Sequence, residues 1–262
     1  MTAPIHALEG WKGIEKEIRR APRVAFFSDF DGTLVRLRRH PGQVVLPVRV
    51  RRLLCAVAQS VPVAGIVSGR RISDVRRRAG VGHIWYVGAH GFFLRTPENR
   101  LISLLANRER ESVRKIQRVL FRRLRGWRGV HLEPKEATVT VHYRSASPGV
   151  AARTRQLLEC VIKEHKGISL MAGKKMWELL PNSHIDKWTG ISFILRRARK
   201  RSGRLRWLPI FLGDDVTDER VFRKMKGISI AVGKKHRTAA RFYLRSPAEV
   251  TQFLERVKAV LT

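Results

Sequence analysis

The sequence predicts an α/β fold in which a Rossmann-like parallel sheet is interrupted by an inserted α+β segment. Short apolar, β-favouring runs end abruptly at polar residues or glycine, as at Val24–Phe27 before Ser28 and Asp29. Helical stretches separate these runs, and this alternation is typical of a parallel sheet with helices on both faces. The rhythm changes between residues 92 and 181 and then resumes. We therefore expect one core domain from residues 1–91 and 182–262 and an inserted domain from 92–181.

The first part of the core is expected to alternate helices and strands. Proline at a first helical position and glycine just past the last mark helix ends, which fits Pro47 and Gly80. An apolar run that stops at a Ser-Gly pair indicates a buried strand entering a loop. The expected elements are a helix at 7–19, strands at 24–27, 61–67 and 84–91, and helices at 47–58 and 72–80.

The inserted segment shows a different pattern. In the run ATVTVHYR, Thr138 and Thr140 alternate with Val139 and Val141, which predicts a half-exposed strand. The expected elements are strands at 92–95, 101–104, 137–144, 168–171 and 176–180, and helices at 108–125 and 149–165. The core pattern then resumes with helices at 187–199 and 217–225, strands at 208–215 and 228–232, and a last helix from Pro247.

The charge is strongly positive. Lys and Arg number 54 against 21 Asp and Glu, a net charge of +33. Such an excess attracts polyanions, but the basic residues are spread through nearly every helix and no zinc-finger or RNP motif accompanies them. A general surface bias and a specific polyanion-binding role both stay open.

There is no apolar run of roughly 18 residues, no signal-peptide pattern and no CxxC pair, so we expect a cytoplasmic protein with buried thiols and no membrane contact.

Reactive side chains follow three of the expected strands, and ligands bind beyond the carboxyl ends of parallel strands. The strongest motif is DFDGTL, which places Asp29 and Asp31 two residues apart on a loop. One carboxylate can attack phosphorus and the other can move protons. The alternatives are a solvated turn or an EF-hand loop. An EF-hand would need Glu where His40 stands and a helix before the loop.

Two weaker motifs carry phosphate-compatible groups. In VSGR, Ser68 and the backbone at Gly69 can donate hydrogen bonds to phosphate at the start of a helix, although a plain Ser-Gly helix cap is a common alternative. Lys187 follows Asp186 at a helix start and can neutralise phosphate as a point charge. In so basic a chain, a surface lysine is the competing interpretation.

The run FLGDDVTDE supplies the candidate metal ligands. Asp214 and Asp215 follow a strand, and Asp218 lies four residues beyond Asp214. Mg²⁺ prefers one or two carboxylates with water and substrate oxygens. Asp214 is the main candidate, with Asp215 and Asp218 as support; Asp218 could instead be a first-turn helix acid.

Together these motifs resemble the haloacid dehalogenase (HAD) superfamily, in order and spacing across the whole chain. The sequence is most similar to the trehalose-6-phosphate phosphatase family within it. The stretches that carry this closer likeness are GAHGFFLR at 88–95, LEPKEATVTVHYR at 132–144, GKKMWELLP at 173–181 and RSPAEVTQFL at 245–254.

The resemblance implies a HAD-type core with an inserted cap and assigns roles to single residues. Asp29 would be the nucleophile, Asp31 the general acid/base, and Ser68 and Lys187 the phosphate contacts. The implied Mg²⁺ ligands are Asp29, Asp31 through its backbone carbonyl, and Asp214. The implied sugar contacts on the cap are Glu133, Lys135, Arg144, Lys174 and Glu178.

The implied activity is Mg²⁺-dependent hydrolysis of trehalose 6-phosphate through an aspartyl-phosphate, with a trehalose-6-phosphate synthase as an implied partner. Phosphatase action on sucrose, mannosylglycerate or glucosylglycerol phosphate, and polyanion binding on a degenerate HAD fold, are the alternatives. Two positions depart from the family pattern: Trp188 stands in place of a glycine, and Pro134 lies inside the Glu-x-Lys element. His90 also matches a family position, where a structural role is equally expected.

Overall fold

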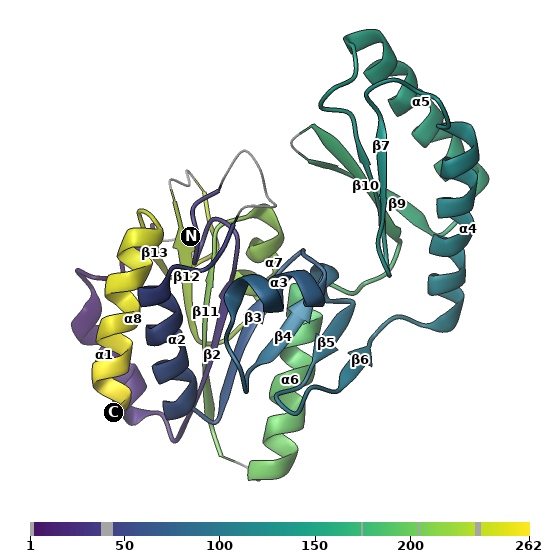
Figure 1. Ribbon diagram of the computed structural model, residues 1–262. Coiled ribbons are helices and arrows are strands. Elements are labelled where there is room, and N and C mark those ends of the chain that lie inside the picture. The colour runs from purple at the N-terminus through teal and green to yellow at the C-terminus, as the bar shows by residue number, and fades with distance from the viewer. Residues whose placement is uncertain (1–2, 38–43, 174, 204, 234–236) are drawn as a thin grey trace. The chain divides into compact units, whose positions relative to one another are not determined.

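The computed structural model describes residues 3–37, 44–173, 175–203, 205–233 and 237–262. The chain divides into a larger unit, Met1–Leu104 with Ile185–Thr262, and a smaller unit, Leu105–His184 (Figure 1). No helix in the described residues is both long enough and apolar enough to cross a bilayer.

The larger unit is built on one sheet, with nine strands in its described residues, in the order β1-β13-β12-β11-β2-β3-β4-β5-β6. In this spatial order, each pair of neighbouring strands from β1 through β11 and β2 to β4 is parallel. Beyond β4, strands β5 and β6 continue the sheet in antiparallel pairing. The strands are β1 Ile5–His6, β2 Arg23–Asp29, β3 Val63–Val67, β4 Trp85–Gly88, β5 Phe93–Arg95, β6 Leu101–Ser103, β11 Trp207–Gly213, β12 Ile228–Val232 and β13 Phe242–Leu244.

Helices cover both faces of this sheet, which is why its central strands are mostly apolar and buried along almost their whole length. Ala25, Phe27 and Phe211 share a core with α6 and α7, while α1, α2 and α8 pack together on the opposite side (Figure 1). The helices are α1 Trp11–Arg20, α2 Val48–Ser60, α3 Ile72–Ala79, α6 Lys187–Ser202, α7 Glu219–Lys224 and α8 Pro247–Leu261, with 3₁₀ turns η2 Ala89–Gly91 and η3 Val216–Asp218.

The strand order changes direction between β2 and β11. From β2 the chain proceeds outward through β3 and β4, whereas from β11 it proceeds the other way through β12 and β13. The loops after β2 and β11 therefore diverge, and such a point in a parallel sheet is where ligands bind. The register pairs Leu212 with Ser28, so Asp29 and Asp214 stand at neighbouring strand ends.

The smaller unit is a four-stranded antiparallel sheet, in the order β7-β8-β10-β9 within its described residues, with two helices on one face. Val139 and Val141 point to the helices and form a core with Ile116 and Leu158. The elements are α4 Asn107–Arg123, β7 His131–Pro134, β8 Val139–His142, α5 Pro148–Glu164, β9 Ile168–Gly173 and β10 Met176–Pro181. Pro134 ends an edge strand, a position that tolerates a missing N–H donor.

Several sequence expectations need correction. The units divide after Leu104 and after His184 rather than after residues 91 and 181, because β5 and β6 hydrogen-bond to β4 and extend the large sheet. Residues 7–10 precede α1 instead of belonging to it, and the short strands β1, β7 and β13 had no recognisable pattern. Thr138 and Thr140 are buried rather than half-exposed. The cysteines are free, but neither is fully buried, and Cys160 is exposed.

Candidate active site

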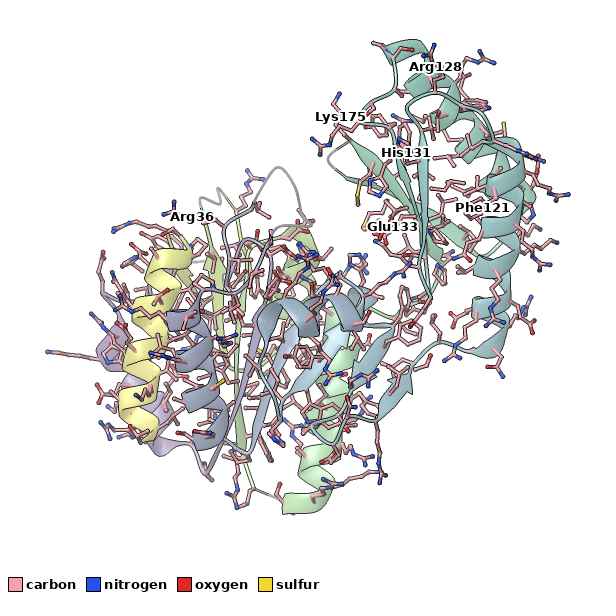
Figure 2. The ribbon with its side chains drawn as sticks, viewed as in Figure 1. Arg36, Phe121, Arg128, His131, Glu133 and Lys175 are labelled. Carbon is pink, nitrogen blue, oxygen red and sulfur yellow. The ribbon has the colours of Figure 1, made fainter. Side chains whose placement is uncertain are left out.

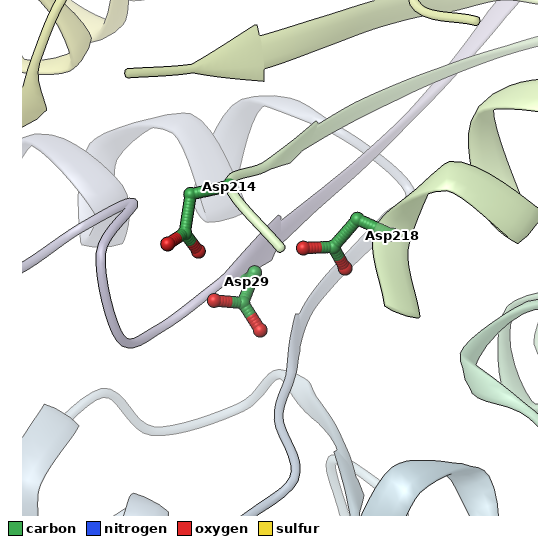
Figure 3. Close-up of side chains that lie close together, drawn as sticks. All are labelled: Asp29, Asp214 and Asp218. Atoms are coloured by element: carbon green, nitrogen blue, oxygen red, sulfur yellow. The ribbon is translucent and has the colours of Figure 1, made fainter. Parts of the chain in front are cut away.

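Three carboxylates meet at the point where the sheet changes direction. Asp29 ends β2, Asp214 follows β11, and Asp218 lies in the turn after it; each offers an oxygen, and these oxygens all lie within 4.8 Å of one another (Figure 3). Asp29 is 4% exposed and Asp218 is 0% exposed. Two of these acids are buried and Asp214 is half-buried. Crowding acids in this way is costly unless cations balance them, so the cluster is a candidate cation site.

The tight loop after β2 requires Gly32. Its φ of +79° is left-handed, and a Cβ there would collide with the Asp214 carboxylate. The backbone N–H of Gly32 donates to the Val35 carbonyl, and the Thr33 hydroxyl donates to Asp214 Oδ1 at 3.2 Å. The DFDGTL loop therefore holds a metal-ligand candidate from the neighbouring strand as well as its own acids.

Lys187 provides the one cation seen inside the cluster among the described residues. Its Nζ donates to Asp29 Oδ1 at 2.7 Å and to Asp218 Oδ1 at 2.8 Å. Asp186 caps the helix that carries it by accepting from the Thr189 N–H at 2.8 Å. Trp188, the residue after Lys187 in α6, packs against the hydrophobic core that this helix shares with the sheet. The bulky ring in place of glycine therefore leaves the lysine directed at Asp29.

The crowding shifts the proton affinities of the cluster. Burial raises the pKa of Asp29 well above its usual value; Lys187 opposes this, and Asp218 and Asp214 add to it. Burial, then Asp218, raises the pKa of Asp214 to about 6. Burial alone would lower the pKa of Lys187, but Asp218 and Asp29 outweigh it and raise that pKa. One lysine thus undercompensates three acids, and their oxygen donors fit a small divalent cation such as Mg²⁺.

The phosphate-compatible loop after β3 lies close to this cluster. Ser68 is buried, and its Oγ accepts from the Arg70 N–H at 3.1 Å, which leaves the hydroxyl able to donate to a ligand. A Cβ at Gly69 would strike the His90 ring, so only glycine allows that ring to pack there. His90 itself has a left-handed φ of 59° and its N–H donates to the Ser68 carbonyl. His90 therefore supports this loop, in line with a structural role.

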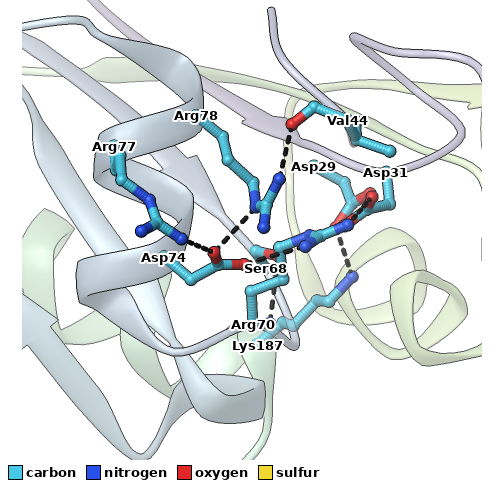
Figure 4. Close-up of polar contacts among 9 residues, drawn as sticks. All are labelled: Asp29, Asp31, Val44, Ser68, Arg70, Asp74, Arg77, Arg78 and Lys187. Atoms are coloured by element: carbon cyan, nitrogen blue, oxygen red, sulfur yellow. Dashed lines mark hydrogen bonds and ion pairs between the residues drawn. The ribbon is translucent and has the colours of Figure 1, made fainter. Parts of the chain in front are cut away.

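The carboxylate of Asp31 is turned toward Arg70. Arg70 Nε donates to one carboxylate oxygen at 2.6 Å and Nη2 donates to the other at 2.7 Å (Figure 4). The same guanidinium donates to Asp74 at 2.8 Å. Asp29 and Asp31, two residues apart, thus have different environments: one is buried against a lysine, the other held by an arginine.

Asp215 and Asp218 lie in different surroundings. The Asp215 side chain is exposed and accepts from the Val216 N–H at 2.6 Å, and it is not part of the acidic group found among the described residues. Asp218 is in that group, and its second oxygen accepts from the Asp215 N–H at 2.9 Å. A metal-ligand role for Asp215, like one for the Asp31 carbonyl, stays a prediction.

The smaller unit brings three of the expected sugar contacts together. Glu133, Thr140 and Glu178 form one cross-strand row on β7, β8 and β10. Glu178 is 2% exposed and accepts from Lys135 Nζ at 3.1 Å and from Thr138 Oγ1 at 2.7 Å. This row lies on the sheet face that α4 does not cover, and Figure 2 shows Glu133 on that face. The exposed Arg144 follows β8, and Lys174 lies outside the described residues.

Sequence reasoning missed four residues that the geometry singles out. Arg70 belongs to the quoted VSGR motif but had received no role, and Asp74 lies one turn further along. Thr33 belongs to DFDGTL. His142 Nε2 lies 3.0 Å from Glu133 Oε2, and its place opposite Glu133 depends on β7, a strand with no clear pattern. Arg70 and Thr33 lie within the quoted motifs and could have been noted there. Asp74 and His142 could be recognised only from the fold.

Comparison with known proteins identifies the family. A model of the trehalose-phosphatase family matches residues 27–248. The chain belongs to this family. Among curated relatives, a trehalose-phosphate phosphatase of Mycolicibacterium paratuberculosis is 33% identical over 89% of this chain and 61% of its own length. A probable trehalose-phosphate phosphatase D of Arabidopsis thaliana is 28% identical over 92% of this chain and 69% of its own length. The chain thus spans about two thirds of the length of these family members.

Solved structures of the trehalose-phosphatase family share the fold. The C-terminal domain of a Candida albicans trehalose-6-phosphate phosphatase has a TM-score of 0.75 at 21% identity, covering 98% of each chain. An Aspergillus fumigatus trehalose-6-phosphate phosphatase has a TM-score of 0.62 at 25% identity, covering 97% of this chain and 99% of that one. A haloacid dehalogenase-like hydrolase from Bacteroides thetaiotaomicron also matches, with a TM-score of 0.66 at 18% identity, covering 90% and 99%. The HAD-type fold expected from the motifs is confirmed.

Proposed function

We propose that this chain hydrolyses trehalose 6-phosphate to trehalose and phosphate, with Asp29 as nucleophile. The observation that carries the proposal is the convergence of Asp29 and Asp214 at neighbouring strand ends, with Lys187 2.7 Å from Asp29. Family membership supports the substrate.

In the first step an oxygen of Asp29 attacks phosphorus in line with the sugar oxygen. The phosphorus–oxygen bond to the sugar breaks as the bond to Asp29 forms, which gives an aspartyl-phosphate. The departing sugar oxygen needs a proton, and Asp31 is proposed to donate it. Lys187 and the Ser68 hydroxyl are proposed to bind the phosphoryl oxygens, with the Gly69 N–H beside them.

In the second step water attacks the phosphorus of the aspartyl-phosphate. Asp31, deprotonated by the first step, accepts a proton from this water. The bond between phosphorus and Asp29 breaks, phosphate leaves, and both carboxylates return to their initial states. Asp218 is proposed to hold Lys187 in place through its 2.8 Å ion pair.

Asp29 and Asp214 are the proposed Mg²⁺ ligands, with the Asp31 carbonyl and the acids at 215 and 218 around them. Mg²⁺, when bound, would supply positive charge to offset that of the transferring phosphoryl group. The carboxyl group of Asp214 must be ionised to act as a metal ligand. With its pKa raised to about 6, the ionised form is the more abundant one at neutral pH.

The smaller unit is proposed to act as the cap that recognises the sugar, and the larger unit as the catalytic core. A disaccharide offers hydroxyl groups that both donate and accept. Glu133 and Glu178 of the cross-strand row supply acceptors, and Lys135, which donates to Glu178, supplies a donor. Arg144 and Lys174 are proposed to join them. The hydrogen bonds around Glu178 fix its orientation before any sugar arrives.

The test is phosphate release from trehalose 6-phosphate with Mg²⁺, comparing the native chain with Asp29→Asn. Loss of turnover of at least ~10³-fold is expected, as is usual when a covalent nucleophile is removed. Glu255→Gln, at an ion pair on α8 away from the site, is the matched control. EDTA should abolish the activity and added Mg²⁺ restore it. Preference for sucrose, mannosylglycerate or glucosylglycerol phosphate in the same assay would overturn the substrate assignment.

Three wider proposals accompany this function. The substrate requires a synthase that makes trehalose 6-phosphate, which is the proposed partner, and the cytoplasm is the proposed location. The net charge of +33 supports non-specific polyanion binding alongside catalysis. Tight, steeply salt-dependent binding of duplex DNA with no phosphatase activity would favour polyanion binding as the main function.

A further inference from the structure

A line of alternating charges leads from Asp31 away from the acidic cluster. Arg70 binds both oxygens of Asp31 and, through Nη1, one oxygen of Asp74 at 2.8 Å. The other oxygen of Asp74 accepts from Arg78 Nε at 2.8 Å, and Arg78 Nη1 donates to the Val44 carbonyl at 2.8 Å (Figure 4). The line joins the loop after β2 to α3 and ends on the backbone.

The Arg70 guanidinium uses all three nitrogens in this line, and its side chain is 14% exposed. A planar fork that meets both oxygens of a carboxylate sets the rotation of that carboxylate as well as its position. A lysine could supply the charge but not this fixed geometry. Asp74 and Arg78 in turn hold the guanidinium in place from behind.

The backbone of Arg70 adds a second link to the site. Its N–H donates to Ser68 Oγ at 3.1 Å, and its carbonyl accepts from the Ala89 N–H at 2.8 Å. The same residue therefore fixes the proposed proton carrier through its side chain and a proposed phosphate contact through its main chain.

We propose that Arg70 is a positioning residue that holds Asp31 for proton transfer, with Asp74 and Arg78 as its support. The proposal rests on the proposed function, in which Asp31 protonates the leaving oxygen and later accepts a proton from water. In the structure both oxygens of Asp31 accept from Arg70, which is the contact that an ionised carboxylate makes. When it carries the proton that the leaving oxygen takes, Asp31 must have turned at least one oxygen away from Arg70 and toward the sugar. Arg70 thus defines the position from which the carboxyl group moves and to which it returns.

The test uses the leaving group, because a sugar oxygen needs a proton to depart and a nitrophenolate oxygen does not. The quantity measured is kcat/KM, which reports the first step, for trehalose 6-phosphate and for p-nitrophenyl phosphate. Arg70→Gln is expected to lose about 10²-fold with the sugar phosphate, the lower end of what proton transfer contributes, and at most about threefold with the aryl phosphate. Arg70→Lys should follow Arg70→Gln, since it cannot form the fork.

A double-mutant cycle shows whether Arg70 acts through Asp31. In an Asp31→Asn background, Arg70→Gln should lower kcat/KM for trehalose 6-phosphate by less than about threefold. Arg77→Gln is the control: this neighbouring arginine also contacts Asp74, at 3.1 Å, but its side chain is 77% exposed, and full activity is expected. If the Arg70 variants fold poorly, Asp74→Asn serves as a second variant. It should show the same selective loss with trehalose 6-phosphate, in a weaker form.

Three results would overturn the proposal. One is equal loss with both substrates, which would indicate direct binding of phosphate or a general structural defect. Another is an undiminished Arg70 effect in the Asp31→Asn background. The third is full activity of Arg70→Gln on the sugar phosphate. Failure of the proposed function would look different: the native chain would not release phosphate, or Asp31→Asn alone would have no effect.

Discussion

Lys187 Nζ lies 2.7 Å from Asp29 Oδ1, although 158 residues separate them in sequence. The contact joins the start of α6 to the end of β2 and is fully enclosed, since both side chains are almost completely buried. Burying an ion pair costs solvation, and that cost is recovered only while both partners remain. The pair therefore links the stability of the larger unit to its proposed chemistry.

Replacing Lys187 with Met should destabilise the chain by about 3–5 kcal/mol, because Asp29 and Asp218 would be left buried without their cation. Urea unfolding in EDTA measures this, and turnover of trehalose 6-phosphate should fall in parallel. Lys200→Met, at an exposed position of the same helix, is the control and should change stability little. Native stability in the Lys187 variant would show that the cluster is not held by this ion pair.

Gly32→Ala should weaken Mg²⁺ binding. The left-handed φ of +79° costs about 1–3 kcal/mol for alanine, and the new methyl group would push the Asp214 carboxylate away. The expected result is a rise in the Mg²⁺ concentration for half-maximal activity, together with a lower melting temperature. Gly13→Ala is a suitable control, since it lies in α1 with nothing within 4 Å of the added Cβ. An unchanged Mg²⁺ requirement would mean that Gly32 does not shape the metal site.

Much of the larger unit could be predicted from the sequence because its buried parallel strands are continuous apolar runs that end in polar motifs. Asp29, Ser68, Lys187 and Asp214 were found for that reason, since each stands at a strand or helix end. Other features depend on tertiary contacts. Nothing local shows that β5 and β6 join the large sheet, and a two-residue strand such as β1 has no periodicity.

The pairing of charges could not be predicted either. In a chain with 54 basic residues, no pattern distinguishes the arginine that faces Asp31 from those in solvent. Asp218 similarly resembles an ordinary first-turn acid until η3 turns it toward Lys187. Motifs pointed to the proposed reacting groups, and the fold showed which charged side chains contact them.

Asp74→Asn should lower stability in a pH-dependent way. Burial alone would raise the pKa of Asp74, but hydrogen bonds from Arg78 and Arg70 outweigh it and lower the pKa to about 2. A carboxyl group whose pKa is lower in the folded than in the unfolded chain stabilises the fold fully at pH values above its unfolded pKa, which is near 4. This stabilisation is lost as the pH falls toward the folded pKa near 2. The difference from the native chain should be about 1–2 kcal/mol at neutral pH after allowance for solvent screening of a partly exposed group.

Urea unfolding between pH 7 and pH 2 tests this difference. It should be constant above about pH 5 and shrink steadily below pH 4. Glu255→Gln, at an exposed ion pair with Arg49, serves as the comparison and should show at most a few tenths of a kcal/mol. A difference between the native chain and the Asp74 variant that grows on acidification would contradict the ion-pair assignment.

Glu178→Gln should separate sugar recognition from phosphate chemistry. Glu178 is buried in the smaller unit and holds Lys135 and Thr138 through hydrogen bonds, so the amide disturbs that arrangement without changing the size of the side chain. The expected result is a drop in kcat/KM of about tenfold or more for trehalose 6-phosphate and little change for p-nitrophenyl phosphate, which has no sugar to recognise. Glu136→Gln, exposed on the same connection between β7 and β8, should leave both substrates unaffected. Equal losses on the two substrates would show that Glu178 supports the fold and does not select the sugar. The proposed role of the smaller unit would then depend on the other proposed sugar contacts.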